Sequence, residues 1–362
     1  MSNSTKAPGM GPETTAIAGI DAKETRFTKL ARTQWLQILI VLIAIIVLFS
    51  IAAPESFPHW GNVRLIIQNA SILAILAVGM TFVIVTAGID LSIGSVLVFS
   101  GVVAAMVMRA MGGDGWGTAI VGIIAAILSG IAWGLFNGLI ITKLKVPPLI
   151  VTLGSMGIAL GLAQILTGGV DIREVPAVLT NSIGYGNVFG TVPVISVIAL
   201  AVVVVGAIIL HRTRFGLHTF AIGSNEESAR RVGVKVDRRL IAVYTLTGGL
   251  TGLAGVLSLS QFSTTAIAGQ TETNLNVITA VVIGGTSLFG GIGTIIGSIV
   301  GLFIPAVLQN GFVIMGVQPF WQQVAVGLVL IIAVYVDQVR RAQASRGGDA
   351  GVWRHLLARR RG

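Results

Sequence analysis

The chain contains repeated uncharged stretches that approach the roughly 20 residues a helix needs to cross a bilayer core. Hydrophobic residues make up 54% of the 362 residues, and charged residues make up 10%. Read as helices, the stretches give ten candidate spans, near residues 35–53, 64–86, 92–109, 118–141, 148–167, 192–210, 240–259, 271–287, 293–313 and 318–336. We therefore predict an all-α integral membrane protein with about ten transmembrane helices.

The basic residues are distributed unevenly around these spans. All but three of the 24 Lys and Arg residues fall on the side of the N-terminus; the exceptions are Arg64, Arg109 and Arg173. Because basic loops are retained in the cytoplasm, we expect both termini to be cytoplasmic in a multi-pass protein of the inner membrane. This bias and anionic inner-leaflet lipids explain the net charge of +10, so no nucleic-acid partner is predicted.

The spans divide the chain into three parts. Residues 1–34 form a cytoplasmic tail with too few apolar residues to fold, 35–336 form the transmembrane domain, and 337–362 form a basic cytoplasmic tail. The weakest span is 271–287, where only Leu275 to Ile283 are strongly apolar. Two arrangements keep the C-terminus cytoplasmic: 271–287 and 293–313 both cross, or both enter the membrane and return.

Glycines recur at intervals of four residues in three spans. The stripes are Gly130, Gly134 and Gly138; Gly248 and Gly252; and Gly293, Gly297 and Gly301. Small residues on one helix face let neighbouring backbones approach closely in a membrane, so these stripes predict helix packing. A G-x-x-L-x-x-G pattern also occurs at 88–94 and at 285–291. It indicates either an internal repeat or the shared chemistry of a tight turn.

The loop 211–239 is the longest segment between spans on the cytoplasmic side. Within it, Ser224 and Glu227 have the spacing of a capping box, and Gly233 suits a helix C-terminus. We therefore predict a short helix over 224–232. Such a short helix is only marginally stable alone in water. It therefore either docks onto a partner or is simply part of a connecting loop.

Three stretches resemble the permeases of ribose/xylose/galactoside-type ABC importers: 77–95 (AVGMTFVIVTAGIDLSIGS), 221–233 (AIGSNEESARRVG) and 282–294 (VIGGTSLFGGIGT). The resemblance covers about residues 35–336, and the N-terminal tail is longer than the family requires. It implies a type II importer fold, a second permease copy or close homologue, a cytoplasmic ABC ATPase and an extracytoplasmic sugar-binding protein.

The segment 221–233 is similar to the coupling helix that seats in the ATPase. The residues that carry this expectation are Gly223, Ser224, Asn225, Glu226, Glu227, Ala229, Arg230 and Gly233. The chain has no G-x-x-x-x-G-K-[ST] phosphate loop, so we expect ATP and Mg to be bound by the partner ATPase and no cofactor to be bound here. The binding protein would dock on the outer segment 168–191.

Polar residues inside the spans are candidates for a sugar path, because amides both donate and accept hydrogen bonds. These are Asn69, Asn137, Gln164, Asn274, Asn276, Gln309 and Asn310, together with Asp90. Amides also join helices within a bundle, so each could equally be structural. A membrane-embedded carboxylate such as Asp90 indicates function by default, although its position in a turn favours helix capping.

Two other functional classes fit less well. An ion-coupled secondary carrier uses carboxylates or histidines at mid-membrane, yet all four histidines fall outside the predicted spans. An intramembrane hydrolase needs a nucleophile or metal cluster, and the chain has no cysteine and no such cluster in its spans. The resemblance thus carries the prediction: it implies a non-enzymatic permease that moves a neutral pentose or hexose inward by alternating access.

Overall fold

The computed structural model describes residues 34–267 and 273–318, and eight single residues between 321 and 335. The predicted tails and tenth span lie outside this part, except for Gln34, Gln318 and those eight residues. The described part is almost entirely helical; its two strands, β1 (Asn187–Val188) and β2 (Val192–Pro193), form a small antiparallel hairpin. This confirms the all-α prediction.

In the part of the chain that the structure describes, nine helices build the bundle. They are α2 (Gln34–Ala52), α3 (Trp60–Val85), α4 (Ile93–Met111), α5 (Trp116–Lys143), α6 (Pro148–Thr167), α8 (Val194–Arg212), α11 (Val236–Phe262), α12 (Thr273–Ile283) and α13 (Ile295–Ile314). Four short elements join them: α7 (Ala177–Leu179), the π-helix η1 (Thr180–Gly184), α9 (Arg214–Ser224) and α10 (Glu226–Arg231). Within the described residues, seven helices are long and apolar enough to cross a membrane, namely α3, α4, α5, α6, α8, α11 and α13.

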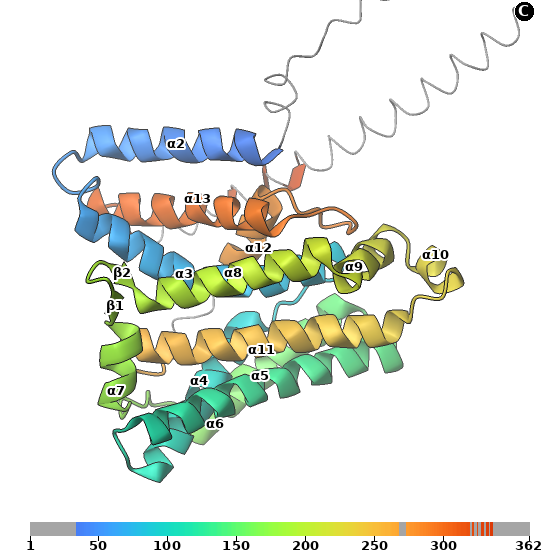
Figure 1. The fold of residues 1–362 in the computed structure, drawn as a ribbon, viewed down its shortest axis with the longest axis horizontal. Helices are drawn as coiled ribbons and strands as arrows, with labels where there is room; N and C mark the ends of the chain where they lie inside the picture. Colours follow the sequence, from blue (N-terminus) through green and yellow to red (C-terminus); the bar gives the residue numbers. More distant parts are fainter. Residues whose placement is uncertain are drawn as a thin grey trace, which may run out of the picture.

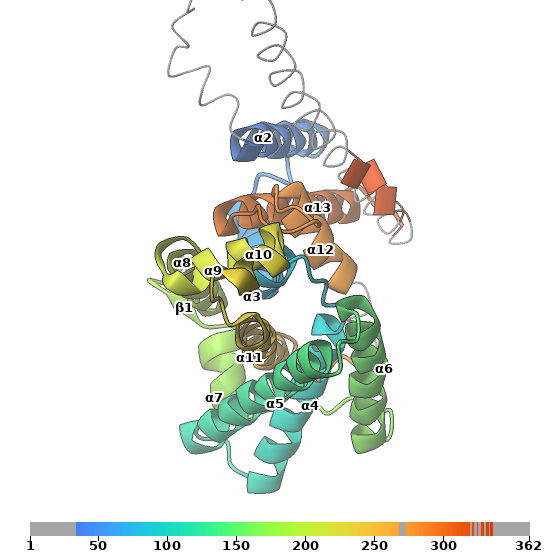
Figure 2. The ribbon, with the colours of Figure 1, turned by 90° about the vertical axis from the view of Figure 1, so that its right-hand side faces the viewer.

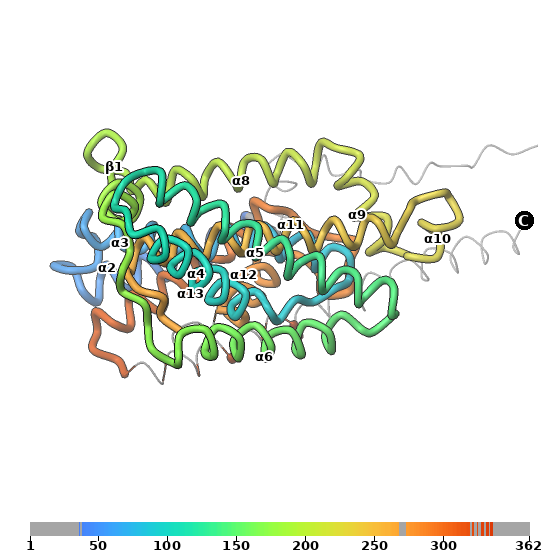
Figure 3. The backbone as a smooth tube through the Cα atoms, turned by 90° about the horizontal axis from the view of Figure 1, so that it is seen from below, coloured from blue at the N-terminus to red at the C-terminus, as the bar shows by residue number. Residues whose placement is uncertain are grey.

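The long helices run along one common direction (Figure 1). The helices α9 and α10 lie at one end of the bundle, which we call the α10 end. The other end carries α7 and the β1–β2 hairpin, and we call it the α7 end. Seen along the bundle, α3 lies between α13 and α12 on one side and α11, α5 and α4 on the other (Figure 2). From below, α8 and α6 flank the bundle on opposite sides (Figure 3).

The glycine stripes lie where helix backbones meet, which confirms their predicted role in packing. A Cβ atom at Gly130 would overlap the carbonyl of Gly248, and one at Gly134 would overlap the carbonyl of Tyr244. The stripe on α5 therefore packs directly against the stripe on α11. Likewise, a Cβ at Gly301 on α13 would overlap the carbonyl of Ala280 on α12.

The weak span 271–287 does not form one crossing helix. α12 has 11 residues, about 16 Å at 1.5 Å per residue, against a hydrocarbon core of about 30 Å. The chain then leaves the helix at Gly284, makes a turn over 284–294, and enters α13 at Ile295. A similar interruption over 86–92 separates α3 from α4. The repeated G-x-x-L-x-x-G pattern therefore marks two turns between helices.

A bulky side chain in the α5–α11 contact should destabilise the protein. Replacing Gly134 by leucine inserts four carbons where the backbone of Tyr244 already lies, and overpacking of this kind costs roughly 1–3 kcal/mol or more. We expect a lower melting temperature in detergent and less protein in the membrane. Gly161→Leu is the matched control, because its Cβ would meet nothing within 4 Å. Equal melting temperatures for the two variants would contradict this packing.

Candidate functional site

The loop 211–239 is mostly helical and forms a protrusion at the α10 end (Figure 1). Thr213 caps α9, because its hydroxyl accepts hydrogen bonds from the backbone N–H groups of Phe215 (3.1 Å) and Gly216 (3.4 Å). Asn225 caps α10, and its Oδ1 accepts from the N–H of Ser228 at 2.8 Å. Two short helices therefore stand where one was predicted.

The predicted capping box is wrong by one residue. Ser224 is the last residue of α9, and its hydroxyl donates to the carbonyl of Phe220 at 2.9 Å. The backbone becomes extended at Asn225 (φ −163°), so the shorter helix α10 begins at Glu226 rather than at 224. Serine and asparagine are both good N-caps, and the sequence alone did not distinguish the two neighbours.

The C-terminal end of α10 agrees with the prediction. Gly233 has φ +85°, in the left-handed region that favours glycine. Its N–H donates to the carbonyl of Arg230, and the N–H of Val234 donates to the carbonyl of Ala229, both at 3.0 Å. This pair of bonds is a Schellman motif. It seats the buried Ala229 against Ile222 and Val236.

Charged side chains cover the exposed faces of α10. Glu226 pairs with Arg230 at 2.9 Å, and Glu227 pairs with Arg231 one position further along. Arg230 also reaches Asp237 at the start of α11, at 2.6 Å. Asp237 and then Glu226 raise the pKa of the Arg230 guanidinium above its ordinary value, because both hydrogen-bond to its charged form. Glu227 and Arg231 are three-quarters exposed, so their pair is free to meet a partner.

The end of α9 touches both interruptions of the bundle. A Cβ atom on Gly223 would overlap the carbonyl of Val85, the last residue of α3, and would lie 2.7 Å from the nitrogen of Gly291. The N–H of Gly291 itself donates to the carbonyl of Val85 at 2.9 Å. Three backbone segments thus meet here without intervening side chains, and they come from the three stretches 77–95, 221–233 and 282–294. We call this meeting point the junction.

A buried polar cluster surrounds the start of α4. Asp90 Oδ1 accepts hydrogen bonds from the backbone N–H (2.8 Å) and the hydroxyl (2.5 Å) of Ser92, which closes the turn in front of the helix. Asn137 Nδ2 donates to the same hydroxyl at 3.0 Å. Asn274 Oδ1 accepts from the N–H of Gly94 at 2.6 Å and so caps α4 from another helix. These bonds explain three of the predicted path residues as structural partners.

Four other predicted path residues share a cavity at the α7 end. Asn69, Asn276, Gln309 and Asn310 all line a space of about 420 Å³ between α3, α11, α12 and α13. Gln261 lines it too and was missed, because the predicted seventh span ended at 259. Gln164 is not brought there; it lies on an exposed part of α6, because α6 buries its opposite face.

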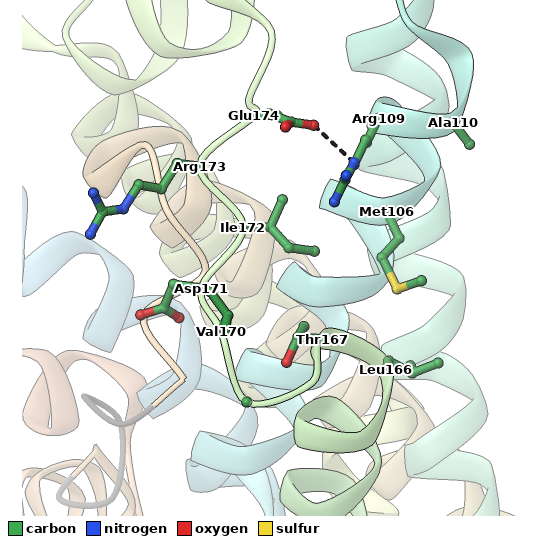
Figure 4. A pocket seen from close by; sticks show the side chains of 11 residues that line it. Met106, Arg109, Ala110, Leu166, Thr167, Val170, Asp171, Ile172, Arg173 and Glu174 are labelled. Carbon is green, nitrogen blue, oxygen red and sulfur yellow. Dashed lines mark ion pairs between the residues drawn. The ribbon is translucent and has the colours of Figure 1, made fainter.

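The segment 168–191, predicted to lie outside, borders a larger pocket of about 990 Å³ beside α4 and α6 (Figure 4). Arg109 on α4 pairs with Glu174 at 2.9 Å across its rim. Asp171 Oδ1 accepts from the N–H of Ile267 at 2.9 Å and from the hydroxyl of Thr265 at 3.0 Å, which fixes the segment to the chain just after α11. Arg173 also lines the pocket, and its side chain points away from Arg109 and Glu174 (Figure 4).

The cap of α10 can be tested by two neighbouring substitutions. Asn225→Ala removes the observed cap and should cost about 1 kcal/mol, whereas Ser224→Ala leaves the cap in place. We expect backbone amides of 226–233 to exchange with deuterium several-fold faster in Asn225→Ala than in the unmodified protein. If exchange were faster in Ser224→Ala and unchanged in Asn225→Ala, the predicted capping box of Ser224 and Glu227 would be correct instead.

Comparison with known proteins identifies the family. The family model described as "Branched-chain amino acid transport system / permease component" matches residues 62–334. The ribose import permease protein of Escherichia coli (strain K12) is 35% identical over 306 residues, covering 84% of this chain and 93% of that protein. The fructose import permease protein of Rhizobium meliloti is 34% identical, covering 85% and 86%.

An inner membrane ABC transporter permease protein of Escherichia coli (strain K12) is 35% identical over 309 residues, covering 83% of this chain and 91% of that protein. No solved structure matches the chain. The family model extends well beyond the three stretches that first indicated the resemblance, from near the start of α3 to beyond α13. The chain therefore belongs to the family of ABC importer permeases, as a membrane-embedded transport component rather than a catalytic one.

Proposed function

We propose that this chain is the permease of an ATP-driven, binding-protein-dependent importer, and that it moves a neutral pentose or hexose inward by alternating access. The observation that carries the proposal is the near full-length similarity to import permeases for ribose and fructose. The composition of the bundle supports it. Its candidate path is lined by amides and apolar groups, which suit a hydroxylated neutral solute.

The distribution of charge supports one orientation in the membrane. Among the described residues, the α10 end carries nine basic side chains: Lys143, Lys145, Arg212, Arg214, Arg230, Arg231, Lys235, Arg238 and Arg239. The α7 end carries Arg64, Arg109 and Arg173. Since basic segments are retained inside, the α10 end is the cytoplasmic one, and both termini are cytoplasmic in an inner-membrane protein.

The α10 end is the proposed contact with the ATPase that binds ATP and Mg. The exposed pair Glu227–Arg231 offers both signs of charge to a partner, while Ala229 and Gly233 anchor the helix to the bundle. Gly223 and Ser224 at the junction then pass any movement of α10 to the turns 86–92 and 284–294. Those turns lead directly into α4 and α13, so a movement of the turns would displace the starts of both helices.

Two further partners complete the proposed assembly. A second permease copy, or a close homologue, forms the dimer implied by the family. The extracytoplasmic sugar-binding protein docks at the α7 end, over the segment 168–191. There the Arg109–Glu174 pair and the pocket beside it give an exposed, polar surface of mixed charge.

The alternative, an ion-coupled carrier, is not favoured. In the part of the chain that the structure describes, no three acidic, histidine or cysteine side chains form a cation-binding group. Asp90 is engaged with Ser92. His211 and His218 lie at the α10 end, in the last turn of α8 and in α9, rather than at mid-membrane.

The energy source of uptake distinguishes the two functions. We expect cells that express the importer to take up the sugar when a protonophore collapses the proton gradient and cellular ATP is maintained. The control replaces the ATPase with a variant that cannot hydrolyse ATP, which should abolish uptake while leaving the permease in the membrane. Uptake that stops with the protonophore and survives loss of ATP hydrolysis would contradict the proposal.

A further inference from the structure

The geometry points to the cavity at the α7 end as a binding subsite for one neutral monosaccharide, oriented by Gln261 and Asn310. This inference rests on the proposed function and names the place where the sugar enters the permease. The cavity extends from Leu65 to Leu73 along α3, about 12 Å at 1.5 Å per residue. Its volume of about 420 Å³ lies in the range of roughly 300–1,000 Å³ typical of small-molecule pockets.

Two amide oxygens at this cavity lack the hydrogen bonds that buried polar atoms normally make. Gln261 is buried, with 8% of its surface exposed, and donates through Nε2 to Asn69 Oδ1 at 2.8 Å. Asn310 donates through Nδ2 to Asn62 Oδ1 at 2.8 Å. Gln261 Oε1 and Asn310 Oδ1 have no partner among the described residues. Both oxygens are also closed to solvent, so a ligand hydroxyl supplies their missing donors only when the two side chains turn toward the cavity.

The lining also selects by charge. Its polar members are amides and hydroxyls (Asn69, Ser258, Gln261, Thr273, Asn276, Gln309 and Asn310), and no charged residue lines the cavity. A phosphorylated or acidic sugar would leave its charge unpaired here, which is costly in a low-dielectric site. The remaining lining is apolar and includes Phe262 at the rim, which is half-exposed. The chemistry therefore fits a neutral polyhydroxylated ligand.

The cavity is closed on its inner side. Ala74, Ala280 and Leu302 pack together as a buried cluster, with Leu73, Val203 and Ile299 around them. Ala74, Ala280 and Leu302 each lie one helical turn closer to the α10 end than a lining residue. These lining residues are Ala70, Asn276 and Ala306, respectively. The cavity is thus blind toward the α10 end, whereas Leu65 and Val313 at its rim are about half exposed or more. A sugar delivered at the α7 end would stop at this layer until the helices move.

A single cysteine can report occupancy of the cavity, because the chain contains none of its own. Gln309→Cys places a thiol on the lining at an exposed position. In the purified permease–ATPase complex, we expect saturating ribose or fructose to slow its labelling by N-ethylmaleimide at least several-fold. Ribose 5-phosphate should give no protection, because no cationic side chain lines the cavity.

Substitution of Gln261 tests its role separately. Gln261→Met keeps the length of the side chain and removes the amide. We therefore expect the protection of the Gln309→Cys thiol by sugar, and the maximal sugar uptake rate, each to fall about tenfold, as for one lost ligand hydrogen bond. Gln164→Met removes an exposed amide of α6 outside the cavity and should leave both unchanged. Co-purification of the ATPase should be equal in all variants, which separates a lost subsite from a misfolded permease.

Two results would overturn the inference. One is labelling of Gln309→Cys that neither sugar slows, in a complex whose unmodified form imports that sugar. The other is a Gln261→Met permease with normal uptake. Failure of the proposed function looks different: the unmodified importer would then show no ATP-dependent uptake of ribose, fructose or other neutral sugars.

Discussion

A polypeptide can leave its helical conformation inside a bilayer only where other protein groups satisfy the freed backbone atoms. Among the described residues, the chain leaves the helical conformation over 86–92 and over 284–294, and hydrogen bonds join the neighbourhoods of these two turns. The N–H of Gly291, in the second turn, donates to the carbonyl of Val85, which precedes the first turn. Asn274, on the helix that precedes the second turn, caps α4, which follows the first turn. These two bonds link the two turns, so the positions of α3, α4, α12 and α13 depend on one another.

This mutual dependence joins the two ends of the molecule. α3 lines the cavity at the α7 end with residues 65–73 and reaches the junction with Val85, about 18 Å further along the same helix. α12 contributes Asn276 to the cavity and leads into the turn that meets Gly223. A displacement of α9 and α10 is therefore delivered to helices that also form the walls and the floor of the cavity. A movement of these helices that separates Ala74, Ala280 and Leu302 would open the floor.

Much of this arrangement could be predicted from the sequence, because local chemistry determines it. The long uncharged stretches predicted the helices, and glycines four residues apart predicted close helix packing, which the structure shows between Gly130 and Gly248. Gly233 as a helix stop followed from its tolerance of positive φ. The cap at Asn225 was misassigned because neighbouring Ser224 satisfies the same rule, and only the path of α9 decides between them.

Contacts between distant residues could not be predicted. Asn274 and Gly94 are 180 positions apart, and no periodicity links them. The same is true of Asn69 and Gln261, whose bond brings a missed amide into the cavity. Asn137 and Asn274 have the residue type expected of a sugar path, yet the structure uses both at the start of α4. An amide in a span therefore indicates a polar contact, and only the three-dimensional position shows whether a ligand or a helix receives it.

The central claim is that the α10 end receives the ATPase and that movement enters the bundle there. Cross-linking in the assembled importer tests it directly, with a single cysteine in place of either Glu227 on α10 or Phe189 on the β1–β2 hairpin, both of them exposed. A short bifunctional thiol reagent should link the cysteine at 227 to the ATPase chain and leave the cysteine at 189 unlinked to it. An ATPase that cross-links to 189, or that never cross-links to 227 in an importer active in uptake, would contradict the account.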